Sequence, residues 1–259
     1  MLAASASLLN IPIVILDIGA HAPAKQVVAV APTAPQRSHV DGSFSDADKI
    51  RELAAKVDVL TVEIEHVNVD VLEQVQISHG VEVHPHPSTI LIIQDKFRQK
   101  EHLLSHTLPV APFLPVDPTE QAVTDAISAL GLPLMLKSRT LAYDGRGNYV
   151  LREPSQIQDA FSALGGRPLY AEKWVPFVKE LAVMVVRTTT GDTFSYPVVE
   201  TIHKDNICHL VFAPLRSRDA GLSAKARGVA ESAVKSLSGA GVFGVEMFLL
   251  GDGTSASHS

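Results

Sequence analysis

The residues with the clearest chemical potential lie between Leu132 and Leu151. Lys137 ends the apolar run LPLMLK, and Gly145 and Gly147 flank Arg146 ahead of the β-prone run NYVL. An ammonium group supplies a point charge for phosphate oxygens, and glycines let backbone N–H groups approach those oxygens because no Cβ intervenes. A hairpin also uses glycine for turn geometry, so by pattern alone a phosphate-binding loop and an ordinary turn explain this strand–loop–strand stretch equally well.

Glutamates in predicted strands form a second set of candidates. The run EIEH ends a predicted buried strand. Because side chains alternate along a strand, Glu63 and Glu65 would lie on one face, and Glu63 and His66 are possible neighbours of a site at Glu65. Carboxylates at such an edge can bind a ligand, and a helix-capping or surface position is the alternative. Glu180 and Glu246 lie within β-prone runs, and a solvent-facing strand position by itself explains Glu180 better than a binding role.

Two further polar stretches have simple structural explanations. Lys96, in DKFRQK, fits the solvated face of a helix. The residues HKDN at 203–206 fit a turn between strands, because Asp and Asn are common turn residues. Neither stretch indicates a site without its companions.

The first elements that must position these residues alternate between strand and helix. The apolar run 11–17 and the run 57–66 are typical of parallel strands covered on both faces. Helical patterns follow at 46–56 and 68–75, and a brief strand at 81–87 is closed by prolines. We therefore expect a small Rossmann-like domain over residues 1–86.

The rest of the chain favours antiparallel strands. We expect an α+β domain over 87–254, with a small subdomain at about 110–175. The β-prone runs 168–175, 179–189, 192–204 and 207–215 are predicted to form one antiparallel sheet, with 241–250 as the last strand. In that sheet Lys137, Glu172, Val175 and Glu180 would line one cleft.

Composition narrows the function classes. The chain has 259 residues, 46% hydrophobic and 19% charged, with a net charge of −6 that argues against a general nucleic-acid binder. The single cysteine, Cys208, excludes an intrachain disulfide and fits a reducing compartment. The early apolar run Ile11–Leu16 is far shorter than the roughly 20 residues needed to span a bilayer. We expect a cytoplasmic protein without membrane or nucleic-acid partners.

Four blocks occur in a fixed order along the chain: KSRTLAYDGRGN, YAEKWVPFVKELAVMVVR, YPVVETIHKDNIC and GVFGVEMF. Together they resemble the carboxyaminoimidazole ribonucleotide synthetases of the ATP-grasp family, in particular the synthetase half of the fungal phosphoribosylaminoimidazole carboxylases. The resemblance extends from about Leu8 to Gly253. It implies an α/β chain with an ATP-grasp domain, whose nucleotide-binding part is an antiparallel sheet, preceded by an incomplete Rossmann-like domain.

The resemblance also implies roles for individual residues. Glu65, Tyr143 and Asp144 would face the ribonucleotide substrate, with Tyr143 and Asp144 as the catalytic pair, and Glu246 would bind Mg²⁺. The backbone of residues 172–175 and the side chain of Glu172 would form hydrogen bonds with the edge of the adenine ring. The residues implied for ATP are Lys96, Lys137, Ala142, Tyr143, Asp144, Gly145, Arg146, Gly147, Asn148, Glu172, Lys173, Trp174, Val175, Glu180 and His203.

The implied reaction belongs to purine (IMP) biosynthesis. ATP and bicarbonate would give carboxyphosphate, whose carboxyl group is captured by the amine of aminoimidazole ribonucleotide. Such a ligase or lyase-type carboxylase works with ATP and Mg²⁺ on these small molecules, and a homodimer is left open. The protein positions the reactants and neutralises charge.

Two parts of the family pattern have no counterpart in this sequence: a glycine-rich turn ahead of the first helix, and a segment after the strand of Glu246 that carries a second metal carboxylate. Because one carboxylate holds Mg²⁺ less firmly, we expect weak ATP binding and carboxylation near background. An inactive nucleotide-binding or partner-binding fragment is the alternative.

Overall fold

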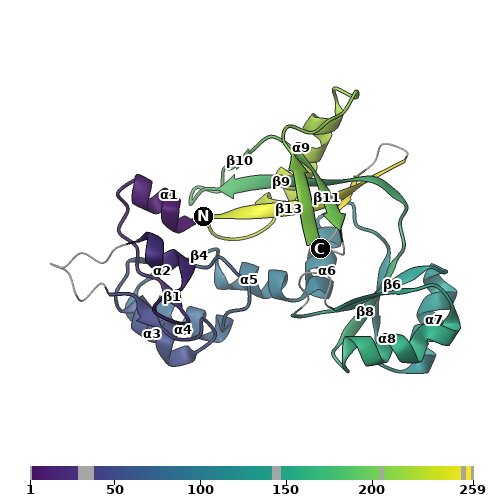
Figure 1. The fold of residues 1–259 in the computed structure, drawn as a ribbon, viewed down its shortest axis with the longest axis horizontal. Coiled ribbons are helices and arrows are strands. Elements are labelled where there is room, and N and C mark those ends of the chain that lie inside the picture. The colour runs from purple at the N-terminus through teal and green to yellow at the C-terminus, as the bar shows by residue number, and fades with distance from the viewer. Residues whose placement is uncertain (1, 29–37, 142–146, 205–206, 252–254, 258–259) are drawn as a thin grey trace. The chain divides into compact units, whose positions relative to one another are not determined.

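The chain divides into two compact units, Met1–Leu91 and Ile92–Ser259. The computed structural model describes residues 2–28, 38–141, 147–204, 207–251 and 255–257. Figure 1 shows the elements of both units.

The first unit is built from short helices and two small parallel sheets. β1 pairs with β2, and β3 pairs with β4. The core between them is apolar, with Leu72, Val75 and Ile90 at its centre. The elements are α1 (Leu2–Leu8), β1 (Leu16–Asp17), α2 (Pro23–Val27), β2 (Val40–Asp41), α3 (Ala47–Ala54), β3 (Val59–Thr61), α4 (Val69–His79), β4 (Glu82–His84) and α5 (Pro87–Gln94), which crosses the unit boundary.

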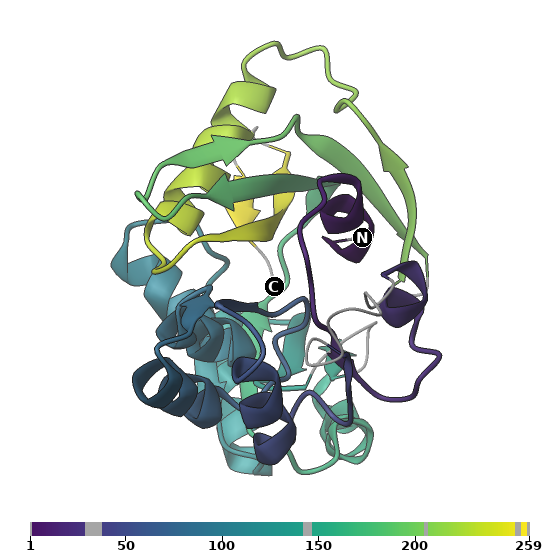
Figure 2. The same ribbon diagram turned by 90° about the vertical axis from the view of Figure 1, so that its left-hand side faces the viewer.

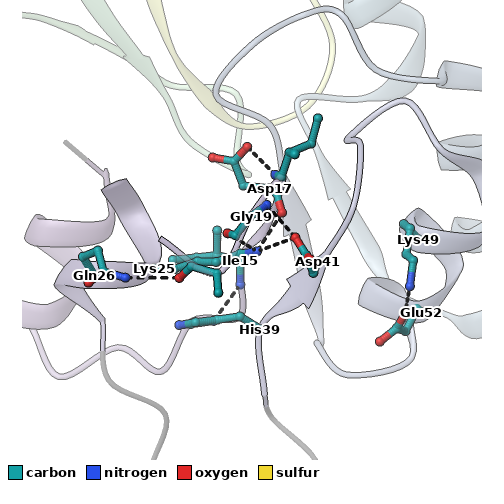
Figure 3. Close-up of polar contacts among 11 residues, drawn as sticks. Ile15, Asp17, Gly19, Lys25, Gln26, His39, Asp41, Lys49 and Glu52 are labelled. Carbon is teal, nitrogen blue, oxygen red and sulfur yellow. Dashed lines mark hydrogen bonds and ion pairs between the residues drawn. The ribbon is translucent and has the colours of Figure 1, made fainter. Parts of the chain in front are cut away.

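A buried lysine ties β1 to β2. Lys25 Nζ donates hydrogen bonds to the carbonyl oxygens of Asp17 at 2.7 Å and Gly19 at 3.1 Å, and lies 3.5 Å from Asp41 Oδ1 (Figure 3). The Gly19 N–H donates to the same Asp41 oxygen at 2.6 Å. Gly19 has a φ of 86°, which glycine adopts without the Cβ clash that disfavours other residues. These contacts fix the turn that follows β1.

Two strands of this unit are shorter than the sequence predicts. The strand expected over 11–17 contains only Leu16 and Asp17, which pair with Val40 and Asp41. The strand expected over 57–66 ends at Thr61, so the prediction that it carries Glu63 and Glu65 to its edge is wrong. Its partner β4 stops at His84 because Pro85 follows, and proline has no N–H to continue a ladder.

The second unit contains two antiparallel sheets with helices against them. Its first sheet has the order β5-β8-β6-β7 and its second the order β12-β11-β9-β13-β14, with β10 paired to β9. The elements are α6 (Lys96–Ser105), β5 (Phe113–Val116), α7 (Glu120–Leu130), β6 (Leu134–Ser138), β7 (Asn148–Leu151), η2 (Pro154–Gln156), α8 (Ile157–Leu164), β8 (Leu169–Lys173), β9 (Phe177–Arg187), β10 (Thr193–Ser195), β11 (Val199–Lys204), β12 (Ile207–Phe212), α9 (Leu222–Lys235), β13 (Gly241–Leu250) and β14 (Ser255–Ser257).

The expectation of one sheet for all these strands is wrong. β8 belongs to the four-stranded sheet and β9 to the six-stranded sheet, so Lys137 and Glu180 do not share a sheet as predicted. The chain leaves one sheet and enters the other over residues 174–176, which are not strand. Pro176 explains the break, because it fixes φ and offers no donor for a ladder.

Each sheet has an apolar face covered by helices. In the four-stranded sheet, Leu134 and Leu136 of β6 pack with Ala160 and Leu164 of α8, and α7 lies beside them (Figure 1). In the six-stranded sheet, alternate residues of β9 and β13 pack against α9, the yellow-green helix of Figure 2. Because side chains alternate along a strand, the residues between these core positions point to the opposite face.

Candidate functional site

A cluster of buried charges lies on the face of the four-stranded sheet opposite its apolar core. Lys137 Nζ on β6 and Lys100 Nζ on α6 each lie 3.2 Å from the same atom, Oε2 of Glu172 on β8. The side chains are only 8%, 1% and 6% exposed, respectively. Two ammonium groups on one carboxylate give the cluster a net positive charge when all three groups are ionised. Positive charge is thereby concentrated near the end of β6, where the hairpin begins.

In this cluster, burial and neighbouring charges shift the pKa of each group in opposite directions. Burial disfavours the charged form of Glu172, but Lys137 and Lys100 outweigh it and hold the carboxyl pKa below its usual value. Burial likewise opposes the charge on Lys137, and the neighbouring Glu172 and Tyr170 outweigh it, so the Lys137 pKa is raised. For Lys100 burial prevails over the attraction of Glu172 and lowers the pKa.

Aromatic side chains enclose the cluster. The Phe97 ring on α6 makes an edge contact with Phe113 of β5 at 5.3 Å between centroids and lies 6.2 Å from Tyr170 of β8. Lys100 Nζ is 5.9 Å from the Phe113 ring centroid, within reach of a cation–π attraction. α6 therefore covers the charged face of the sheet with both a charge and an apolar ring.

An ion pair anchors the start of α6 at the end of β6. Arg139 donates to Asp95 through Nη2 at 2.6 Å and Nε at 3.1 Å, and its guanidinium lies 4.8 Å from the Phe97 ring centroid. Asp95 also caps α6 by accepting from the N–H groups of Phe97 and Arg98. The Lys96 N–H donates to the Arg139 carbonyl at 2.8 Å. The backbone of Lys96 is thus fixed beside the strand that carries Lys137.

The hairpin predicted to bind phosphate leaves from this strand. Lys137 pairs with Asn148 in the β6–β7 register, and the Ser138 N–H donates to the Gly147 carbonyl at 2.7 Å. Gly147 has a φ of 92°, a conformation that favours glycine. The predicted residues Ala142, Tyr143, Asp144, Gly145 and Arg146 lie outside the described residues.

The segment predicted to read adenine follows directly from the cluster. Lys173 ends β8 as an exposed residue whose N–H donates to the Pro112 carbonyl at 2.8 Å. Trp174 and Val175 come next, with the Arg152 guanidinium 6.0 Å from the Trp174 ring centroid. Both lysines lie against Oε2 of Glu172, and adenine contacts by the backbone and the acidic side chain of this segment stay a prediction.

A second group of polar residues lies on the six-stranded sheet, on the face away from α9. Glu180 of β9 and His203 of β11 are hydrogen-bonded through the carboxylate and Nδ1. A bulge between Ile202 and His203 re-aims the histidine. Glu246 of β13 is exposed and pairs in register with Ala182, two residues after Glu180, so its side chain lies on the same face. This face can present a carboxylate to a metal and a His–Glu pair to a polar ligand.

Sequence reasoning missed Lys179 and Arg216 as partners of Glu200. Glu200 of β11 accepts from Lys179 Nζ at 2.7 Å and from Arg216 Nη2 at 3.0 Å, and the Arg216 guanidinium lies 3.4 Å from the Phe212 ring centroid. Lys100 was missed as well, although its spacing of four residues from Lys96 places both on one side of a helix. Nothing in the sequence connects the other partners, which come from separate elements.

The remaining predicted residue, Glu65, belongs to the first unit. It lies in the bend between β3 and α4, with Oε1 3.9 Å from His66 Nε2. Over the described ranges no group of three His, Cys, Asp or Glu residues is arranged to hold a metal ion. No helix in that part of the chain is long and apolar enough to cross a membrane.

Comparisons with known proteins identify the family. The ATP-grasp domain matches residues 101–257, which is more than half of the chain. The chain belongs to the ATP-grasp family. Residues 1–94 match the ribonucleotide synthetase preATP-grasp domain. The fold class expected from the sequence is therefore confirmed.

Relatives of this ATP-grasp chain carry names that agree with the sequence resemblance. It is 53% identical to the phosphoribosylaminoimidazole carboxylase of Ogataea methanolica over 98% of this chain and 45% of the relative. It is 34% identical to the N5-carboxyaminoimidazole ribonucleotide synthase of Pseudomonas aeruginosa over 85% of this chain and 59% of the relative. The chain thus spans about half the length of the curated relatives it matches.

Solved structures agree as well. A carboxyaminoimidazole ribonucleotide synthase from Aspergillus clavatus complexed with ATP matches with a TM-score of 0.92 and 44% identity, over 99% of this chain and 65% of that one. The synthase of that organism in complex with ADP and 5-aminoimidazole ribonucleotide gives the same TM-score at 42% identity, over 100% and 65%. The resemblance to ATP-grasp carboxyaminoimidazole ribonucleotide synthetases is confirmed.

Proposed function

We propose that this chain is the ATP-binding synthetase part of a phosphoribosylaminoimidazole carboxylase of purine biosynthesis, acting in the cytoplasm. ATP would phosphorylate bicarbonate, and the amine of 5-aminoimidazole ribonucleotide would take the carboxyl group as phosphate leaves. The observation that carries the proposal is the buried Lys137–Glu172–Lys100 cluster beside a glycine-containing hairpin, in a chain with a TM-score of 0.92 to a synthase complexed with ATP.

The chain's own residues divide this work. Lys137 supplies a positive charge that its neighbours keep protonated, and Lys96 is held near it by the α6 anchor. The backbone of residues 172–175 would bind the adenine edge, while Glu180 and His203 would bind the ribose and nucleotide. Tyr143 and Asp144, in the loop, would orient the substrate amine, and Glu65 would contact the ribonucleotide. Such preorganised charges stabilise phosphoryl transfer without reorganisation during the reaction.

Glu246 is the residue of this arrangement that we propose as a ligand of a divalent cation. Glu246 is an exposed carboxylate on the same sheet face as Glu180, and hard oxygen ligands suit Mg²⁺. Mg²⁺ is commonly bound by one or two carboxylates together with substrate phosphates, so a single glutamate is compatible with Mg²⁺–ATP. Bound there, the cation would neutralise charge on the phosphates. Glu246 would hold it in place.

The test is nucleotide binding measured by calorimetry. Lys137→Met keeps the apolar stem and removes the charge, and Lys100 still neutralises Glu172, so the fold is retained. We expect Lys137→Met to weaken ATP binding by about 1–3 kcal/mol, the scale of a lost charged hydrogen bond. The control is Lys235→Met, which removes an exposed lysine at the end of α9.

Two results would contradict the proposal. The first is unchanged ATP affinity in Lys137→Met while the wild-type chain binds. The second is a wild-type chain that shows no ATP binding in the same calorimetric assay.

A further inference from the structure

Lys100 has no role in the proposed chemistry, yet it is among the most deeply buried side chains of the molecule. We propose that Lys100 is a positioning residue of the nucleotide site: it helps to neutralise Glu172, which weakens the hold of that carboxylate on Lys137 and lets Lys137 bind the phosphates of a nucleoside triphosphate. This inference rests on the proposed function. It assigns a task to a residue that would not touch the nucleotide.

The geometry that carries the inference is the sharing of one oxygen atom. Both ammonium groups lie 3.2 Å from Glu172 Oε2, one from β6 and the other from α6. Lys137 stands opposite Asn148 at the base of the hairpin, and Lys100 is enclosed by Glu172 and the Phe113 ring. An arriving phosphate therefore meets Lys137, while Lys100 stays with the carboxylate.

Removing Lys100 would change the competition for Lys137. Glu172 would then keep Lys137 as its lysine partner, and attraction between opposite charges is strong where water is excluded. A phosphate would have to draw Lys137 away from a carboxylate left without its second cation. With Lys100 present, Glu172 remains neutralised when Lys137 turns to the phosphate.

A purely structural role explains Lys100 poorly. Burial lowers the Lys100 pKa, which means that its charge is held there at a cost in stability. Glu172 keeps Lys137 as a partner when Lys100 is replaced, so no buried charge is left unpaired. A methionine at this position, beside Phe97 and Phe113, would fill the space without that cost. We expect Lys100→Met to fold with stability equal to or above that of the wild type.

The test compares four proteins by calorimetry with ADP and a non-hydrolysable ATP analogue. We expect Lys100→Met to bind the triphosphate about tenfold more weakly than the wild type, a difference of about 1.4 kcal/mol. The double variant Lys100→Met/Glu172→Gln removes the competing carboxylate and should return the affinity to within about threefold of the wild type. The matched control Arg98→Met removes an exposed charge from the same helix and should bind like the wild type.

The outcomes separate this inference from the proposed function. A wild-type chain that binds no nucleotide refutes both. A wild-type chain that binds, with Lys100→Met binding equally well, refutes only the role of Lys100. Loss of affinity that Glu172→Gln does not reverse, or that accompanies a loss of stability, shows that Lys100 acts through packing and also refutes the inference.

Discussion

The anchor between Asp95 and Arg139 allows a prediction whose size follows from the contacts. Asp95→Ala removes two interactions at once: the α6 cap, in which Asp95 accepts from Phe97 and Arg98, and the ion pair with Arg139. A lost N-cap costs about 1 kcal/mol and a lost charged hydrogen bond about 1.5–3 kcal/mol. The pair is largely shielded, with side chains 17% and 28% exposed, so solvent screens it little. We expect Asp95→Ala to lower the free energy of unfolding by about 2–4 kcal/mol.

Asn at the same position separates the two contributions. Asp95→Asn keeps an acceptor for the helix N–H groups and loses only the charge, so it should cost about 1–2 kcal/mol, similar to Arg139→Met. Urea unfolding followed by fluorescence reports on this unit alone, because Trp174 is the only tryptophan of the chain. The reasoning fails if Asp95→Asn destabilises as much as Asp95→Ala, or if both change the free energy by less than about 0.5 kcal/mol.

Two further predictions concern pH and local opening. Because the Glu172 pKa lies below its usual value of 4.5, its charged form stabilises the fold above pH 4.5, and this stability is lost as pH falls from there through the folded pKa. Acid unfolding, followed by Trp174 fluorescence, should therefore depend less steeply on pH in Glu172→Gln. An identical pH profile in the variant and the wild type would contradict the stabilising role of the Glu172 charge. Hydrogen exchange should be faster for amides of residues 11–17 than for 241–250, because β1 has two paired residues whereas β13 is paired along its length to β9 and also to β14. Equal protection would refute this.

The sequence predicted local elements well where the pattern and its partners are near in the chain. The two strands predicted around Lys137 are observed as β6 and β7, which pair with each other. The prediction failed where the end of a strand is set by its partner strand. Pro85 ends β4, the partner of β3, so Glu63 and Glu65 lie beyond the paired residues of β3. Pro176 was visible, but only the fold shows that the chain changes sheets there.

The charged cluster shows why part of the candidate site escaped prediction. Glu172 was expected to face adenine because the family resemblance places it in the adenine-binding segment 172–175, and its alternation with Ala171 does place it away from the apolar core. What alternation cannot show is which helix covers that face. Lys100 was therefore invisible as a partner of Glu172, and Arg139 as a partner of Asp95, until the strands and α6 were placed together.

The link between Lys100 and Glu172 also has a consequence for how the second unit folds. The two residues are 172 − 100 = 72 positions apart, so their contact closes a long loop and forms late compared with the β6–β7 hairpin. Until α6 docks, both charges remain hydrated. Once it docks, Lys100 is buried beside Glu172, since an unpaired buried charge is strongly disfavoured, whereas Glu172 also has Lys137 as a partner. Docking of α6 thereby depends on β8, because β8 carries the carboxylate beside which the Lys100 charge is buried.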